Sequence, residues 1–233
     1  MFAFRALGLG LMLFAAGSQL GATTILSEGF LDVTTLSADG WVVTNNSAPV
    51  GSSDWFQGNP AVFPAQGGPG DSYIAAGFNS ASFGGDISNW LISPEFLVDN
   101  NVVVSFYTRT DSPQSFADRV EVRLSLNGAS TDVGTTATSV GDFITVIQPI
   151  NAALDVEGYP GSWTRYTVTL AVPDGATNGR IAFRYFVPNT ELNGNYIGID
   201  TLAIAAVPEP SSLGLIAAGL AALALRRTRR NRT

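Results

Sequence analysis

The side chains that this chain offers for chemistry are carboxylates, hydroxyls and arginine. Its 233 residues include no His and no Cys, and all 12 basic residues are Arg. Ser–His and Cys–His nucleophile pairs, lysine Schiff bases, thiolate metal sites and disulfides are therefore excluded. The one enzyme class left open is a hydrolase with a carboxylate pair. Because so many acids make some close pair inevitable, the composition does not favour that class, and we predict a protein that is not an enzyme.

Aromatic side chains are the second group with a possible binding role. The chain has four Trp and six Tyr, and such rings can stack on sugar rings when they are exposed. Trp90 lies in an apolar run before Pro94, which indicates burial, and most of the other aromatic rings are expected in the core. Trp55 lies in a polar stretch beside Gln57 and Asn59. We therefore choose Trp55 as the candidate ligand-binding residue.

The N-terminal segment has the order of a secretory signal peptide. Arg5 precedes an apolar run over residues 6–16, and small residues follow at 17, 18, 21 and 22. The run is too short to span a bilayer, which takes about 20 apolar residues. We predict a signal peptide over residues 1–22. A buried N-terminal helix is the alternative, but the segment has no polar stripe.

The C-terminal segment has three parts with separate physical roles. Residues 207–210 are Val207, Pro208, Glu209 and Pro210, and the two prolines favour an extended segment that a processing enzyme can bind. Residues 211–225 are predicted to form a transmembrane helix, and residues 226–233 a positive cytoplasmic tail. The apolar anchor positions are Leu213, Leu215, Ile216, Leu220, Leu223 and Leu225, and the tail carries Arg226, Arg227, Arg229, Arg230 and Arg232.

This three-part order resembles the PEP-CTERM sorting signal of Gram-negative bacteria that make extracellular polysaccharide. The resemblance implies recognition and processing by an exosortase, a membrane-embedded enzyme. It also implies export through the inner membrane, a membrane-anchored precursor, and a final place at the cell surface or in the extracellular matrix. A plain tail anchor would need only the apolar run and the arginines.

The segment between the two ends, residues 23–206, is strongly acidic. It holds 18 of the 19 acidic residues and six of the 12 arginines, which leaves it with a net charge of −12. Nucleic acid and anionic membrane surfaces are poor partners for such a charge, whereas cations and neutral polymers are better ones.

Alternation of apolar and polar residues predicts about ten strands in this segment. Residues 118–127 place Val120, Val122 and Leu124 on one face, and arginines and Glu121 on a face expected to meet water. Turn residues separate the strands, and no helical periodicity interrupts them. We predict an all-β, antiparallel two-sheet sandwich of jelly-roll topology. The predicted strands are 25–30, 41–44, 72–78, 89–93, 102–108, 118–127, 143–148, 164–170, 180–185 and 196–205.

Several short segments of this domain, in their order along the chain, resemble the choice-of-anchor J and cleaved-adhesin domains, which are jelly-roll relatives of the MAM domain. The most specific are residues 89–94 (NWLISP) and 196–200 (YIGID), and others are 27–30 (SEGF), 71–75 (DSYIA) and 163–166 (WTRY). At the C-terminal motif the family often has two successive acids, whereas this chain has Asp200 followed by Thr201. The chain also carries a long insert at residues 129–160, to which the sequence assigns no role.

The resemblance implies a structural Ca²⁺ near the first and last strands. Glu28 lies on the first and Asp200 on the last, and two carboxylates brought together would repel unless a cation bridged them. Asp71, in a glycine-rich loop, is the third candidate ligand, because Ca²⁺ takes only oxygen ligands. The alternative is that these acids accept hydrogen bonds from loop amides.

Together these observations predict an exported, exosortase-processed protein whose domain acts as a non-catalytic adhesin-like or carbohydrate-binding module. Its expected partner is extracellular polysaccharide. The alternatives are a carboxylate-dependent polysaccharide hydrolase and a purely structural matrix protein.

Overall fold

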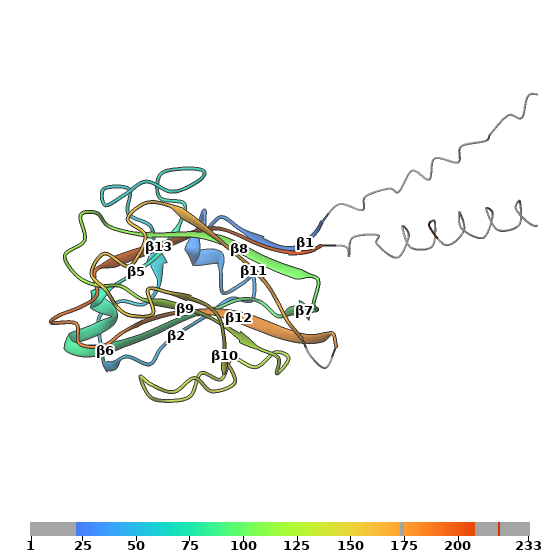
Figure 1. Cartoon of the computed structure of the whole chain (residues 1–233). Coiled ribbons are helices and arrows are strands. Elements are labelled where there is room, and N and C mark those ends of the chain that lie inside the picture. The colour runs from blue at the N-terminus through green and yellow to red at the C-terminus, as the bar shows by residue number, and fades with distance from the viewer. Residues whose placement is uncertain (1–21, 173–174, 208–218, 220–233) are drawn as a thin grey trace, which may run out of the picture. The chain divides into compact units, whose positions relative to one another are not determined.

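Two antiparallel sheets packed face to face form the domain, as the computed structural model in Figure 1 shows. The structure describes residues 22–172, 175–207 and 219, and Ala22–Val207 make up one compact unit. Sheet A has the order β11 (Thr164–Thr169), β8 (Val102–Thr110), β13 (Tyr196–Ala206), β5 (Ile74–Gly77) and β4 (Phe56–Gln57), and β1 (Thr23–Glu28) also pairs with β13.

Sheet B has the order β10 (Thr145–Ile150), β9 (Val120–Ser125), β12 (Thr177–Val187), β6 (Ala81–Ile92) and β2 (Val42–Asn45). Two short strands extend it, because β3 (Ala48–Val50) pairs with β6 and β7 (Phe96–Val98) pairs with β12. Two short 3-10 helices, η1 (Val33–Thr35) and η2 (Phe78–Ser80), precede β2 and β6. Between 22 and 172 and between 175 and 207 the chain forms no α-helix.

The predicted antiparallel two-sheet sandwich of jelly-roll type is confirmed. Each of the ten predicted strand ranges overlaps a strand of the structure. Sequence reasoning missed β3, β4 and β7, which have two or three residues each and are too short to show alternation. The first and last strands are paired, as expected, with Glu28 opposite Leu202.

Apolar side chains from both sheets meet in one core. Val120, Val122 and Leu124 of β9 are buried in it, as the alternation predicted. Phe183 of β12 meets Phe106 of β8 across the two layers, with ring centroids 5.0 Å apart. Burial of such side chains stabilises the fold by about 25 cal/mol per Å² of apolar surface.

The expectation that the other face of β9 meets water is wrong. Residues 129–143, the first part of the insert, cover the outer face of sheet B, where Val133 and Phe143 pack against Trp90 and Ile92. In Figure 1 this segment runs in olive along the outer side of the lower layer. Apolar residues within the insert make the cover stable, and Arg184 of β12 is buried with 1% exposure beneath it.

A second loop covers the outer face of sheet A. Residues 58–72 place Phe63 against Tyr73, with ring centroids 5.1 Å apart, and Trp163 and Tyr196 pack edge-on against the same ring. The guanidinium of Arg109 lies 4.3 Å from the Phe63 ring centroid. Each sheet therefore carries a loop on its outer face, and neither face is a bare platform.

Both ends of the domain leave the sandwich side by side, because Thr23 pairs with Ala206. The predicted signal peptide (1–22), transmembrane helix (211–225) and arginine tail (226–233) lie almost wholly outside the described residues, as do Pro208, Glu209 and Pro210. In the part of the chain that is described, no helix has the length and apolar character to cross a membrane. The predicted domain limits, residues 23 and 206, stay predictions.

Candidate functional site

Asp200, the central acid of the predicted calcium site, lies fully buried at an irregularity of β13. The pairing with β8 shifts between Asp200 and Ala203, and Thr201 adopts a left-handed backbone with φ 50°, which is unusual for a β-branched residue. The Asp200 carboxylate accepts hydrogen bonds from the backbone amides of Gln66 (2.8 Å), Gly67 (3.1 Å) and Thr201 (2.5 Å). Asp200 thus fixes the 58–72 loop to the bulge.

The surroundings of Asp200 do not fit a cation. Burial raises the pKa of its carboxyl group, against the lowering effect of the loop amides. The groups that face it are donors, whereas Ca²⁺ requires six to eight oxygen acceptors. Glu28 accepts a hydrogen bond from the Phe30 amide at 2.6 Å.

Asp71, the third candidate ligand, lies exposed in its loop, and its backbone carbonyl accepts from the Gln57 side chain at 2.6 Å. Within the described residues, no group of three or more Asp, Glu, His or Cys side chains is placed to hold a metal ion. Glu28 and Asp200 instead fit the alternative, in which these acids accept hydrogen bonds from backbone amides of loops. Calcium binding stays a prediction, which these three residues do not support.

Trp55 does not have the exposed ring that the sequence suggested. It is 7% exposed and belongs to the main core with Trp41, which is 3% exposed. The polar neighbours of Trp55 in the chain misled the prediction, because the segment that precedes β4 turns this ring inward while Asp54 stays exposed. Trp55 is therefore not a surface platform for stacking.

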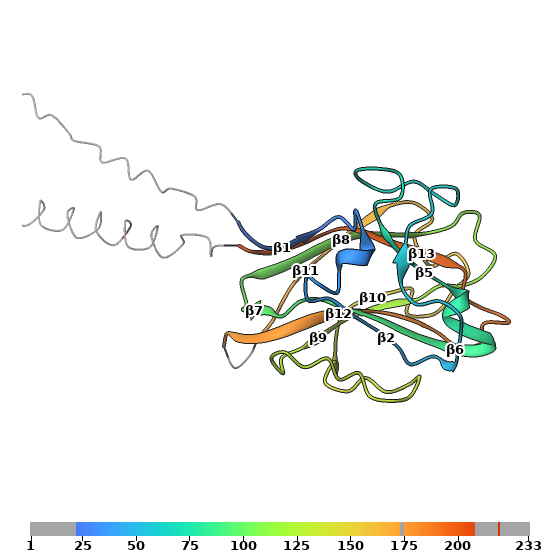
Figure 2. The same cartoon turned by 180° about the vertical axis from the view of Figure 1, so that it is seen from behind.

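Trp41 and Trp55 instead line one cavity of about 290 Å³. We call it the edge cavity, because β2 and β4 are the outermost strands on this side of sheets B and A. Figure 2 shows the segment that carries η1, in blue, crossing between the two layers here. The sequence did not indicate that Trp41 and Trp55 line the same cavity, since no local pattern links positions 14 residues apart. The cavity is lined by Val33, Leu36, Ser37, Trp41, Val43, Trp55 and Ile74.

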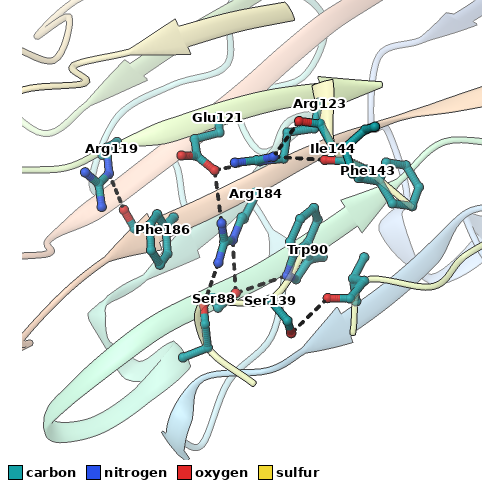
Figure 3. A network of polar contacts seen from close by, with 12 residues as sticks. Ser88, Trp90, Arg119, Glu121, Arg123, Ser139, Phe143, Ile144, Arg184 and Phe186 are labelled. Carbon is teal, nitrogen blue, oxygen red and sulfur yellow. Dashed lines mark hydrogen bonds and ion pairs between the residues drawn. The ribbon is translucent and has the colours of Figure 1, made fainter. Parts of the chain in front are cut away.

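A buried ionic network lies on the outer face of sheet B (Figure 3). Glu121 Oε2 pairs with Arg123 Nε at 2.7 Å and with Arg184 Nη1 at 3.1 Å. Arg184 also donates to the Ala137 carbonyl of the covering segment, and its guanidinium lies 3.7 Å from the Phe186 ring centroid. The network therefore connects two strands of the sheet to the loop that covers them.

The charges in this network shift one another's pKa. Burial by itself raises the pKa of Glu121, but Arg123 and Arg184 outweigh it, so the pKa lies below its ordinary value. Burial lowers the pKa of Arg184 to about 10, against the opposing effect of Glu121. Both groups are charged at neutral pH, and their role here is to hold the cover on the sheet.

A second buried carboxylate, Asp118, joins strands of both sheets. It accepts hydrogen bonds from Thr110 Oγ1 (2.5 Å), Tyr185 Oη (2.5 Å) and the Asn195 amide (2.8 Å). Burial raises its pKa, although all three donors act to lower it. Asp118 was not predicted, because a single Asp before a strand has no distinctive spacing.

None of the three cavities that we describe brings two carboxylates together. The edge cavity has no acidic lining residue, and a second cavity of about 330 Å³ has only Asp142. A third, of about 370 Å³, is lined by Leu126, Val172, Gly175, Ala176 and Thr177. A carboxylate-pair hydrolase would need two acids in one open cleft.

Comparison with known proteins identifies the C-terminal signal and the fold. Residues 206–230 match the PEP-CTERM protein-sorting motif. No match to a curated protein was found. The chain therefore carries a PEP-CTERM sorting signal, which indicates export and processing by an exosortase, as predicted.

Solved structures with the same fold include cleaved adhesin domains of Lys-gingipain. The K2 domain is 21% identical, with a TM-score of 0.52, over 77% of this chain and 98% of that one. The K3 domain, from Porphyromonas gingivalis, is 16% identical, with a TM-score of 0.52, over 78% and 98%. The K1 domain from the same organism is 19% identical, with a TM-score of 0.51, over 77% and 96%. The domain thus has the adhesin-like sandwich fold that its sequence resembled.

Proposed function

We propose that the sandwich is a non-catalytic binding domain that an exosortase-processed precursor delivers to the cell surface, where it associates with extracellular polysaccharide. The observation that carries this proposal is the direct junction of the domain with its sorting signal. Strand β13 ends at Ala206, the Val207 amide still donates to the Asn101 carbonyl at 2.7 Å, and the matched motif begins at residue 206. The sandwich is therefore the cargo of the signal.

The arrangement of the acids supports a binding role over catalysis. His, Cys and Lys are missing from the chain. The buried acids Asp118 and Asp200 and the partly buried Glu121 are already bound by donors of the domain itself. The net charge of −12 over residues 23–206 favours a neutral glycan or one bridged by cations over an anionic polymer.

A sedimentation assay with purified Ala22–Val207 tests the proposal. This unit contains the whole core, so it is expected to fold without the sorting signal. We expect it to sediment with at least one insoluble neutral polysaccharide and to release no reducing sugar. Binding to none of a panel of neutral and acidic polysaccharides would leave the purely structural alternative, and release of sugar would favour the hydrolase.

A further inference from the structure

The 58–72 loop covers only one end of the outer face of sheet A. It is fixed to the bulge at Asp200, and its Phe63 packs against Tyr73 and Trp163. Figures 1 and 2 show the loop above the end of the layer that holds β5, whereas no described segment lies above the end that holds β1. We call this second end the open face. Its outward positions are Thr24 and Ser27 of β1, Ala203 and Ala205 of β13, Val103, Ser105 and Tyr107 of β8, and Arg165, Thr167 and Thr169 of β11.

Strand pairing arranges these side chains in rows across the sheet, because directly opposite residues share a face. The rows are Ser27–Ala203–Ser105–Thr167, Thr24–Ala205–Val103–Thr169 and Asp200–Tyr107–Arg165. Arg165 Nη2 donates to Ser105 Oγ at 3.2 Å, so these two side chains lie on the same side of the sheet. The alternate residues Val104, Phe106 and Ile204 belong to the core. The rows therefore face outward.

The open face has no free acidic group, although residues 23–206 carry 18 acids. Asp200, at its border, is buried with its carboxylate bound by loop amides. Glu28 is opposite the core residue Leu202 and so does not belong to the outward rows. Arg165 is exposed, and among the described residues it forms no ion pair and only the one side-chain hydrogen bond to Ser105. Its remaining N–H groups are available to a ligand.

The side chains of the open face limit the kind of ligand. Exposed hydroxyl groups of β1 and β11, among them that of Thr167, lie at its two sides. Ala203 and Ala205 between them are small, so a ligand can approach the sheet closely. The half-buried Tyr107 offers part of its ring for packing against C–H groups, and Arg165 offers donors for oxygen atoms. The net charge of −12 over residues 23–206 disfavours an anionic ligand. A neutral, hydroxyl-rich molecule with apolar C–H groups matches this surface.

The size of the open face excludes a second copy of the domain as a stable occupant. Four strands about 4.8 Å apart and three rows about 6.7 Å apart give it an area of at most about 400 Å². A stable protein interface buries about 800 Å² per partner. Two copies that each carry a charge of −12 would also repel one another. A single sugar chain is narrow enough for this area.

We propose that the open face binds a chain of neutral polysaccharide. Arg165 donates hydrogen bonds to hydroxyl oxygens of the chain, the hydroxyl groups of β1 and β11 contact its two sides, and the Tyr107 ring packs against a sugar unit. This inference rests on the proposed association with polysaccharide and assigns a binding face to it.

Backbone amide signals in nuclear magnetic resonance spectra of Ala22–Val207 locate the binding face directly. The probes are cellohexaose, xylohexaose and mannohexaose, with hexagalacturonate as the charged counterpart. We expect at least one neutral hexasaccharide to move the signals of Arg165, Thr167 and Ala203, while those of residues 129–143 on sheet B stay unchanged. Hexagalacturonate should move none of them. The proposal is overturned if no neutral hexasaccharide moves the open-face signals, or if only hexagalacturonate does.

Two substitutions on the open face test its contribution to affinity. Arg165→Gln removes the charged donors, and we expect it to weaken binding about tenfold, roughly the effect of one hydrogen bond. Thr167→Glu places a charge that the sugar chain would have to desolvate, and it should weaken binding at least about tenfold. Thr135→Glu, at an exposed position of the segment that covers sheet B, is the matched control and should bind normally.

Melting temperatures show whether each variant is folded. Weaker binding by a folded Arg165→Gln or Thr167→Glu variant, with normal binding by Thr135→Glu, supports the proposal. Unchanged binding by both open-face variants contradicts it, and so does equal weakening by Thr135→Glu.

The two proposals fail in different ways. If Ala22–Val207 sediments with a neutral polysaccharide and the Arg165→Gln/Thr167→Glu double variant does so equally, the open face is not the site, while the proposed function stands. If the unsubstituted domain binds no polysaccharide and no hexasaccharide, the proposed function is wrong and the assignment of the open face is wrong with it.

Discussion

Arg184 Nη1 lies 3.1 Å from Glu121 Oε2 on the outer face of sheet B, beneath the covering segment 129–143. Only 2% of the Arg184 side chain is exposed, against 16% for Glu121. Removing one member of such a buried pair leaves a charge without compensation, which is more damaging than the pair is stabilising.

The Glu121→Gln variant should therefore be markedly less stable. It leaves Arg123 and Arg184 without their shared carboxylate, and we expect the free energy of unfolding to fall by about 3 kcal/mol. Urea denaturation measures this value. Glu95→Gln, at an exposed position, is the control and should lie within about 0.5 kcal/mol of the wild type. Equal stability of both variants would show that the network contributes nothing to the cover.

The buried Asp118 should make the stability depend on pH. Its pKa in the folded state is raised by burial, so its favourable contribution is complete below its ordinary value of 3.8 and is lost as the pH rises through the folded-state pKa. The Asp118→Asn variant cannot ionise. Its unfolding free energy relative to the wild type should therefore be higher at about pH 8 than at about pH 3.5, as measured by urea denaturation.

Asp142 offers a control of opposite sign for this prediction. Hydrogen bonds from Ser130 and Asn127 lower its pKa, so its contribution is present above its ordinary value of 3.8 and is lost as the pH falls. The unfolding free energy of Asp142→Asn relative to the wild type should therefore be lower at about pH 8 than at about pH 3.5. A common sign for the two variants would contradict this account of Asp118.

Gly179 allows a close approach between neighbouring strands of sheet B. A Cβ atom at this position would overlap the Ser125 carbonyl of β9 and lie 3.1 Å from Val98 Cγ2 of β7. Gly179→Ala should lower the free energy of unfolding by about 1–3 kcal/mol, as overpacking does. Gly29→Ala, which meets no atom within 4 Å, is the matched control. A melting temperature for Gly179→Ala as high as that of the control would contradict the prediction.

Substitutions of Asp200 and Asp71 distinguish a loop anchor from a calcium site. Asp200→Ala leaves the amides of Gln66, Gly67 and Thr201 without their acceptor, so we expect a loss of about 2–3 kcal/mol in stability. Asp71→Ala, on an exposed side chain, should change it by less than about 0.5 kcal/mol. EDTA should leave the melting temperature unchanged. Destabilisation by both substitutions and by EDTA would restore the calcium site.

Local patterns predicted the strands because alternation along a strand reports which side chains face the core. Val120, Val122 and Leu124 were assigned correctly for this reason. The same alternation was wrong about the opposite face, since it cannot show that a distant loop returns to cover Arg123 and Arg184. The composition alone excluded catalysis by His, Cys or Lys, because a residue type that the chain lacks is lacking in every fold.

The sequence by itself determined where this protein is sent and that its exported part is an acidic sandwich of antiparallel strands. Sorting signals are read as short linear segments, and strands follow from a period of two, so both are written in neighbouring residues. Only the tertiary structure decided that Asp200 anchors a loop, that Trp55 is buried, and that Trp41 and Trp55 share a cavity. Those relations depend on which distant segments the packing of the two sheets brings together.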